Sequence, residues 1–128
     1  MAAFGEKAFM LLRANGRSLG IVGWQVENLV ARTDEVYLDS SLSPLDGLST
    51  IMKEVERASR ELQCEISLLF LPSDYVGRSD LFSALGYEQR PVHSLGVRAW
   101  EEAAQESMPA GSLLLFKQLR QDRVLRPV

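Results

Sequence analysis

The sequence is poor in the residues that carry most metal and nucleophilic chemistry. Its 128 residues include one cysteine, Cys64, and one histidine, His93. A lone cysteine cannot form an internal disulfide, so a reducing compartment is allowed. One histidine and one cysteine cannot build a usual zinc site, and no aspartate-rich loop suggests magnesium. Nucleophilic hydrolysis has little support either, because a triad would depend on His93 and no Gly-x-Ser-x-Gly turn occurs.

Long apolar runs and an excess of one charge are also missing. No uncharged stretch approaches the roughly 18 apolar residues that a membrane-spanning helix needs, and an acid, Glu6, lies where a signal peptide would be basic or apolar. With 14 basic and 17 acidic residues, the net charge of −3 gives no reason to expect nucleic acid or an anionic membrane as partner. We therefore expect a soluble cytoplasmic protein.

The length and the apolar fraction of 46% are those of one ordinary globular domain. We expect a single domain over 1–128, with a solvated basic tail over 120–128. Within the domain, Asn15-Gly16 predicts a tight hairpin turn, because both residues tolerate positive φ. The turn separates the apolar run 9–12 from a strand-like segment over 19–26.

The middle of the chain is typical of a βαβ unit. A strand with one apolar and one polar face is expected over 35–40, after a turn at Thr33-Asp34. Ser43-Pro44 is a good helix start, because serine caps and proline suits the first helical position. The apolar residues that follow recur at helical spacing: Leu48, Ile51, Met52, Val55, Ala58 and Leu62. Glu56 and Arg60 fall on the opposite, polar face.

A buried strand over 65–71 completes this unit, and the crossover geometry makes its two strands parallel. Ser79 is expected to cap a short helix that ends at Gly86. A strand is expected over 92–97, then a helix around Trp100, and a last strand over 112–119. This order predicts an α+β fold with a mixed, mostly antiparallel sheet around a central βαβ unit.

From about Ala8 to Leu119, the chain resembles the Gcn5-related N-acetyltransferase (GNAT) superfamily. The resemblance rests on the hairpin that ends in Gly20–Trp24, on the βαβ unit from Glu35 to Leu71, and on the segment Leu81–Glu88, which looks like the family's helix with a leucine-glycine-aromatic end. It implies the acyl-CoA N-acyltransferase fold. It also implies transfer of an acetyl group from acetyl-CoA to a primary amine of a small-molecule acceptor.

The resemblance also indicates where acetyl-CoA would bind. The pantetheine arm would pair with the backbone of the strand over 35–40, and the family's Gln/Arg-x-x-Gly-x-Gly/Ala phosphate loop corresponds to 44–49. A helix N-terminus suits phosphate because its amides are free and its dipole is positive. The residues expected at the coenzyme are Leu38, Ser40, Gly47, Leu48 and Ser49. Glu35 matches the position from which some members of the family use a carboxylate as general base.

The sequence departs from the family at several positions. Pro44 has no amide to donate, and Asp46 brings negative charge close to the expected phosphates. Phe82 stands where many members have a tyrosine that protonates the leaving thiolate. Only about seven residues precede the first predicted strand, so we expect the family's first strand and two helices to be missing.

Three hypotheses follow. The first is an active acetyltransferase, and the second is a non-catalytic binding or assembly module on the same fold. A missing N-terminal wall would leave apolar surface uncovered, which favours a homodimer in either case. The third hypothesis is a metal-free relative of the glyoxalase and bleomycin-resistance proteins, but their paired modules predict an internal repeat, and none is seen.

Overall fold

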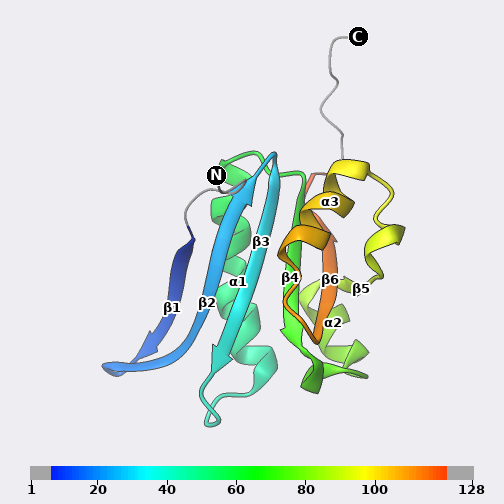
Figure 1. Cartoon of the computed structure of the whole chain (residues 1–128). Helices are drawn as coiled ribbons and strands as arrows, with labels where there is room; N and C mark the ends of the chain where they lie inside the picture. The colour runs from blue at the N-terminus through cyan, green and yellow to red at the C-terminus, as the bar shows by residue number, and fades with distance from the viewer. Residues whose placement is uncertain (1–6, 121–128) are drawn as a thin grey trace.

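A computed structural model describes residues 7–120 (Figure 1). Strands and helices alternate along the chain after an initial three-stranded meander. In order, the elements are β1 (Ala8–Ala14), β2 (Arg17–Glu27), β3 (Val30–Leu38), α1 (Pro44–Glu61), β4 (Ile66–Pro72), the 3₁₀ turn η1 (Ser73–Tyr75), α2 (Ser79–Leu85), β5 (Glu88–Gln89), the 3₁₀ turn η2 (Val92–Ser94), α3 (Arg98–Ser107) and β6 (Ser112–Gln118).

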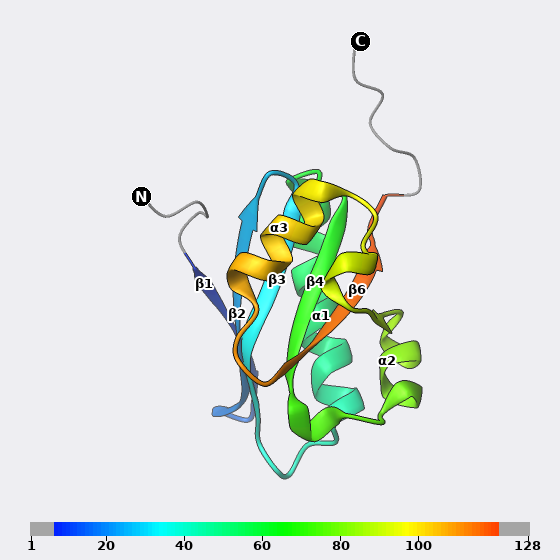
Figure 2. The same ribbon diagram turned by 45° about the vertical axis from the view of Figure 1, so that its right-hand side comes forward.

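The strands form one six-stranded sheet in the order β1-β2-β3-β4-β6-β5. Among the described strands, only β3 and β4 pair in parallel, and the other neighbouring strands are antiparallel. Helix α1 lies on one face of the sheet and α3 on the other, while α2 packs beside α1 (Figures 1 and 2). The predicted α+β class, with a mostly antiparallel sheet around a βαβ unit, is confirmed.

Each face of the sheet has its own hydrophobic core. The core under α1 and α2 contains these buried side chains: Val22, Leu48, Ile51, Met52, Val55, Leu69, Leu71, Leu81, Phe82, Leu85, Tyr87 and Leu115. The core under α3 contains Val30, Ile66, Leu68, Phe70, Leu95, Trp100, Ala103, Ala104, Leu114 and Phe116. Strand β4 supplies residues to both cores, as its nearly continuous apolar sequence requires.

The first hairpin forms as predicted, with φ of 53° at Asn15 and 76° at Gly16. The prediction of a second turn at Thr33-Asp34 is wrong. The turn occurs at Asn28-Leu29, where φ is 49° and 66°, whereas Thr33 and Asp34 lie within β3. The Glu65 amide donates to the Leu29 carbonyl at 2.7 Å and so fixes this turn. Strand β3 therefore begins at Val30, because residues 30–33 pair with strands on both sides.

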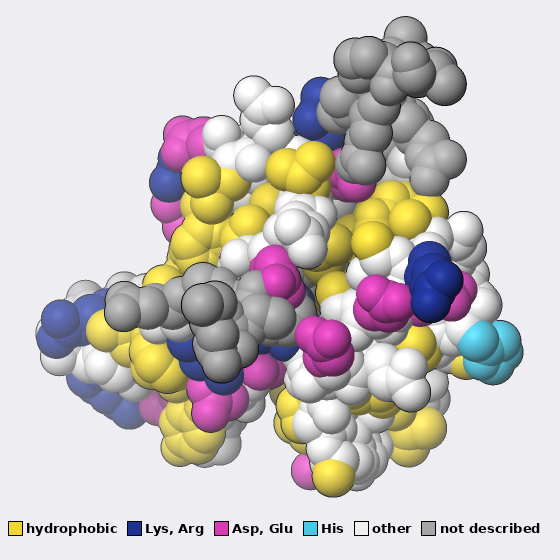
Figure 3. Space-filling model, turned by 45° about the horizontal axis from the view of Figure 1, so that its top comes forward, with side chains coloured by type: hydrophobic (Ala, Val, Ile, Leu, Met, Phe, Trp, Pro, Cys, Tyr) yellow, Lys and Arg dark blue, Asp and Glu magenta, His cyan; other side chains and the backbone are white. Residues whose placement is uncertain are grey.

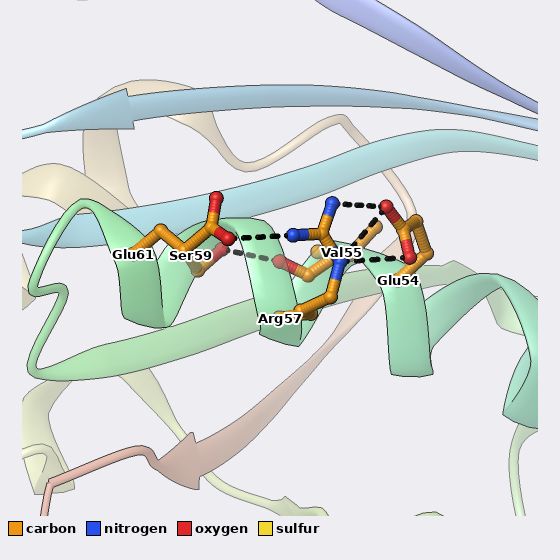
Figure 4. Close-up of polar contacts among 5 residues, drawn as sticks. All are labelled: Glu54, Val55, Arg57, Ser59 and Glu61. Atoms are coloured by element: carbon orange, nitrogen blue, oxygen red, sulfur yellow. Dashed lines mark hydrogen bonds and ion pairs between the residues drawn. The ribbon is translucent and has the colours of Figure 1, made fainter.

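Helix α1 begins as the sequence predicts. Ser43 is the N-cap, and its hydroxyl accepts from the Asp46 amide at 3.2 Å. On the outer face, the Arg57 guanidinium lies between the carboxylates of Glu54 and Glu61 (Figure 4). The same view shows the Ser59 hydroxyl turned back onto the Val55 carbonyl, at 2.7 Å.

Two side chains of this helix differ from the predicted pattern. Glu56, expected on the polar face, is 6% exposed and lies 2.8 Å from Lys117 Nζ of β6. Leu62, expected in the apolar stripe, follows the end of the helix and is 52% exposed.

The segment after α2 contains the largest error of the sequence interpretation. Helix α2 starts at Ser79, so the prediction of Ser79 as its cap is wrong and Arg78 is the N-cap. Gly86 ends the helix at a φ of 82°, as predicted. The strand expected over 92–97 does not form. The short strand β5 lies before this segment, and His93 is exposed in η2 instead of lying in a strand. Gly96, at a φ of 86°, cannot continue an extended strand.

Cys64 lies just before β4 and is fully buried. Burial raises the pKa of its thiol to about 11, because the low-polarity surroundings disfavour the thiolate. Within residues 7–120, no helix is long and apolar enough to cross a membrane. The basic tail predicted over 120–128 lies outside the described residues except for Arg120.

Candidate functional site

The central feature of the fold is the separation of β3 from β4. Their parallel ladder joins Val30 with Ile66 and ends at the pair Thr33 and Leu69. Beyond this pair the two strands diverge toward their carboxyl ends (Figure 1). We call the wedge between β3 residues 34–38 and β4 residues 70–72 the splay. In the space-filling view, the surface is notched at its lower edge, between the side that carries β1–β3 and the side that carries β4 and β6 (Figure 3).

A β-bulge opens the splay on the β3 side. Ile21 pairs with Tyr37 and Gly23 with Asp34, so β3 holds one residue more than β2 between these pairs. Glu35 supplies the irregularity, with a φ of 50°. A bulge increases the local bend of a strand, which here turns β3 away from β4. The edge of β3 that faces β4 is therefore left without a ladder partner from residue 34 onward.

Glu35, the candidate general base, lies at this bulge and is held by a lysine. Its carboxylate is 2.9 Å from Lys7 Nζ, which also lies 3.0 Å from Asp34 Oδ1. Partial burial disfavours the charge of Lys7, but the hydrogen bonds to Glu35 and Asp34 outweigh it and raise the lysine pKa. The Glu35 side chain is 57% exposed, so water reaches its carboxylate.

The loop between β3 and α1 approaches the same end of the splay, but its amides are already engaged. The Ser41 amide donates to Asp39 Oδ1 at 3.2 Å, and the Leu42 amide donates to the Asp39 carbonyl at 3.0 Å. The Gly47 amide donates to the Ser43 carbonyl at 3.0 Å. Because the Asp46 amide is also taken and proline has none, this loop offers few free donors to a phosphate.

Gly47 is buried, and neighbouring side chains occupy the space beside its Cα. A Cβ at Gly47 would meet Cδ2 of Leu38 and Cδ2 of Leu42, each at 3.0 Å. Leu38 also crowds Gly20 on β2, where a Cβ would lie 2.9 Å from its Cδ2. The glycine therefore permits close packing of leucines in this structure.

The other three predicted coenzyme residues are not gathered around one cavity. Leu48 is fully buried in the core under α1. The Ser49 hydroxyl donates to the Asp46 carbonyl at 3.3 Å, within the first turn of the helix. Ser40 is exposed in the loop after β3. Of the predicted set, Leu38 and Glu35 border the splay directly through the backbone of β3.

Sequence reasoning missed a buried hydroxyl at the apex of the splay. Thr33 belongs to the last pair of the β3–β4 ladder and is fully buried. Its Oγ1 has no hydrogen-bond partner among residues 7–120. Only the pairing of the strands reveals this position, since threonine is an ordinary strand residue by sequence.

Three aromatic residues bear on the proton donor that the sequence resemblance implies. Phe82 is 3% exposed in the core and has no hydroxyl. Tyr37 is 68% exposed on β3. Tyr75 follows β4 in η1 and packs, partly buried, against the core cluster that Val36 and Leu38 also contact. Tyr37 thus lies on the β3 side of the splay, and Tyr75 lies just beyond its β4 side, where it is the less exposed of the two.

A hollow of about 260 Å³ lies elsewhere, over α2 and β5. Its lining is formed by Gly77, Ser79, Phe82, Ser83, Tyr87, Glu88 and Gln89. No residue of β3 contributes to it, so this hollow is separate from the splay.

No protein-family model and no curated protein sequence matches the chain. Solved structures, in contrast, do match the chain. An acetyltransferase of the GNAT family from Staphylococcus aureus Mu50 superposes with a TM-score of 0.66 and 12% identity, over 88% of this chain and 67% of its own. The PaiA N-acetyltransferase from Thermoplasma acidophilum was solved in complex with coenzyme A. It superposes with a TM-score of 0.62 and 11% identity, over 88% of this chain and 60% of its own.

Tetrahymena Gcn5 is similar as well, with a TM-score of 0.63 and 10% identity over 90% of this chain and 69% of its own. At such low identities the likeness establishes the fold. The chain has the acyl-CoA N-acyltransferase fold of the GNAT acetyltransferases, as the sequence resemblance implied.

Proposed function

We infer that the splay binds acetyl-CoA and that the protein transfers the acetyl group to a primary amine of a small molecule. The observation that carries this proposal is the end of the β3–β4 ladder at Thr33 and Leu69. An unpaired strand edge offers backbone donors and acceptors to an extended ligand, and the amides of a pantetheine arm suit such an edge. Among the structural neighbours, the Thermoplasma PaiA N-acetyltransferase was solved with coenzyme A.

The residues present fit the two ends of acetyl-CoA unequally. The β3 edge over 34–38 suits pantetheine. At the α1 N-terminus, Pro44 and the engaged amides of Leu42 and Gly47 leave little for the pyrophosphate. We therefore expect the pantetheine portion to supply most of the affinity, and Ser40 and Ser49 to contribute little.

The proposed reaction is a direct attack. The amine nitrogen bonds to the thioester carbon, the carbonyl oxygen takes the negative charge, and the carbon–sulfur bond then breaks. Backbone N–H groups of β3 at the bulge would stabilise the oxyanion. Glu35, directly or through water, accepts the proton that the amine loses. The thiolate needs a proton in return, and we assign its delivery to Tyr75.

Binding can be tested with two ligands in one experiment. Calorimetric titration with acetyl-CoA and with S-acetylpantetheine should give dissociation constants within about tenfold of each other, a difference of roughly 1.4 kcal/mol. A ligand that binds the native state should also raise the melting temperature with concentration. Absence of binding and of any shift at millimolar acetyl-CoA would contradict the proposal.

Turnover is tested by replacing the proposed base. Glu35→Gln should lower the acetylation rate of a panel of primary amines, by up to about 10²-fold, without weakening acetyl-CoA binding. Glu54→Gln is the matched control, because Glu54 is also an exposed carboxylate paired with a cation but lies on the outer face of α1. Equal rates for both variants would exclude Glu35 as the base.

A second candidate function is favoured by the engaged phosphate loop. A non-catalytic binding or assembly module on this fold would have no need of free amides at the α1 N-terminus, and Phe82 in place of a tyrosine suits it. This candidate predicts a stable protein that neither binds acetyl-CoA nor acetylates any amine in the panel.

A further inference from the structure

Strand β1 forms an uncovered edge of the sheet. It pairs with β2 on one side, and its other side has no strand partner within residues 7–120. Figures 1 and 2 show β1 at the end of the sheet, with α3 over the strands farther in. Soluble proteins usually protect such an edge with a short strand, charged residues or proline. Here β1 runs over seven residues, Ala8–Ala14, with one charge, Arg13.

The side chains of β1 add apolar surface to this edge. Phe9 is 56% exposed and Leu11 55%, on the sheet face opposite α1. The exposed row continues inward, because Leu11 pairs with Ile21, which pairs with Tyr37, itself 68% exposed. On the other face, Met10 and Leu12 are only partly buried against the core. Both faces of β1 thus carry apolar groups that lack full cover.

The order of residues in β1 is self-complementary. If a second copy pairs antiparallel with β1 about a two-fold axis at Leu11, residue 11 lies opposite residue 11 of the second copy. Residue 9 then lies opposite residue 13, which sets the Phe9 ring beside an Arg13 guanidinium on the same face. The bulge between Leu12 and Arg13 does not disturb this alternation, because the extra residue, Leu19, belongs to β2.

Charge also favours this orientation. At the start of β1, Lys7 pairs with Asp34 and Glu35, which leaves an excess of one negative charge. At its end, Arg17 pairs with Asp39, and Arg13 on β1 adds a positive charge beyond that pair. An antiparallel arrangement brings the acidic end of one copy to the basic end of the other, whereas a parallel arrangement would join like ends.

We propose that β1 is a homodimer interface, in which the β1 strands of two copies pair antiparallel about Leu11 and form one continuous sheet. The second copy covers Phe9 and Leu11 and satisfies the free backbone edge. This surface lies at the far end of the sheet from β5, and of the residues proposed for acetyl transfer only Glu35 bears on it, through its charge.

Cysteine cross-linking tests the register. Under mild oxidation, Leu11→Cys should form a disulfide-linked dimer, because directly opposed residues have Cα atoms about 4.5–5.5 Å apart. Phe9→Cys alone should not cross-link, but a mixture of Phe9→Cys and Arg13→Cys should. The native Cys64 is buried, so it should not cross-link under these conditions. Cross-linking of Phe9→Cys with itself, or none by Leu11→Cys, would overturn the proposed register.

Mass measurement tests the interface itself. Light scattering at about 100 μM should give twice the chain mass of 14.3 kDa. Leu11→Lys should give a monomer with unchanged circular dichroism. The matched control is Val76→Lys, which places the same charge at a 67% exposed apolar residue outside the sheet, and should remain dimeric. A monomeric wild-type protein, or a dimer that Leu11→Lys leaves intact, would refute the proposal.

Discussion

Lys117 on β6 and Glu56 on α1 form an ion pair of 2.8 Å across the interior, between residues 61 positions apart in sequence. The Glu56 side chain is 8% exposed and that of Lys117 25%. The same ammonium lies 5.6 Å from the centre of the Tyr87 ring and contacts the Leu85 carbonyl at 3.4 Å, at the end of α2. One lysine therefore links α1, α2 and β6.

Replacing this lysine should be costly. Lys117→Met leaves the buried Glu56 without its main partner, and we expect a loss of about 2–3 kcal/mol in the free energy of unfolding, below the range for fully buried pairs because Lys117 is partly exposed. The control Arg57→Met removes an exposed cation from Glu54 and Glu61 and should cost at most about 1 kcal/mol. Urea denaturation measures both; equal losses would show that burial of the pair is unimportant.

Removing either of two buried hydroxyls on neighbouring strands should change the free energy of unfolding, and the two changes should have opposite signs. Thr33→Val removes an Oγ1 that has no partner among residues 7–120 and keeps the side-chain shape, so it should stabilise the protein by up to about 1 kcal/mol. Ser67→Ala removes the hydroxyl that lies 2.7 Å from Tyr87 Oη, and should destabilise by about 1–2 kcal/mol. If Thr33→Val were as destabilising as Ser67→Ala, the Thr33 hydroxyl would have a partner after all.

The Cys64 thiol should affect stability at alkaline pH. The folded protein raises its pKa from 9.0 to about 11, so the unfolded chain loses this proton first. Stability is therefore unaffected below pH 9 and falls as the pH rises from 9 to 11, by at most about 1.4 kcal/mol per unit from this group. Cys64→Ala should flatten the fall relative to the wild type. Parallel curves for the two proteins would show that the thiol ionises equally well when folded.

The acetyl-transfer proposal makes a separate prediction for Tyr75. Tyr75→Phe should lower the turnover number by about 10²-fold and leave the affinity for acetyl-CoA unchanged, because the hydroxyl acts only on the leaving thiolate. Tyr37→Phe removes an equivalent hydroxyl from a 68% exposed tyrosine and should have no effect. A turnover number that survives Tyr75→Phe would mean that solvent protonates the thiolate.

The sequence predicts the elements that local chemistry controls. Asn15-Gly16 determines the first hairpin, because the turn needs positive φ at both residues. Ser43-Pro44 determines where α1 begins, because capping and proline geometry act within one turn. The apolar run of β4 and its crossover from β3 then suffice for the fold class.

Tertiary contacts decided the rest. The second turn lies at Asn28-Leu29 because residues 30–33 pair with strands on both sides, and no local pattern encodes that pairing. Lys7 meets Glu35 from 28 positions away. The sequence by itself determined that the chain could form a GNAT fold. Only the packed structure decided that β3 separates from β4 beyond Thr33 while the loop before α1 uses its own amides, because both depend on which distant groups satisfy each backbone bond.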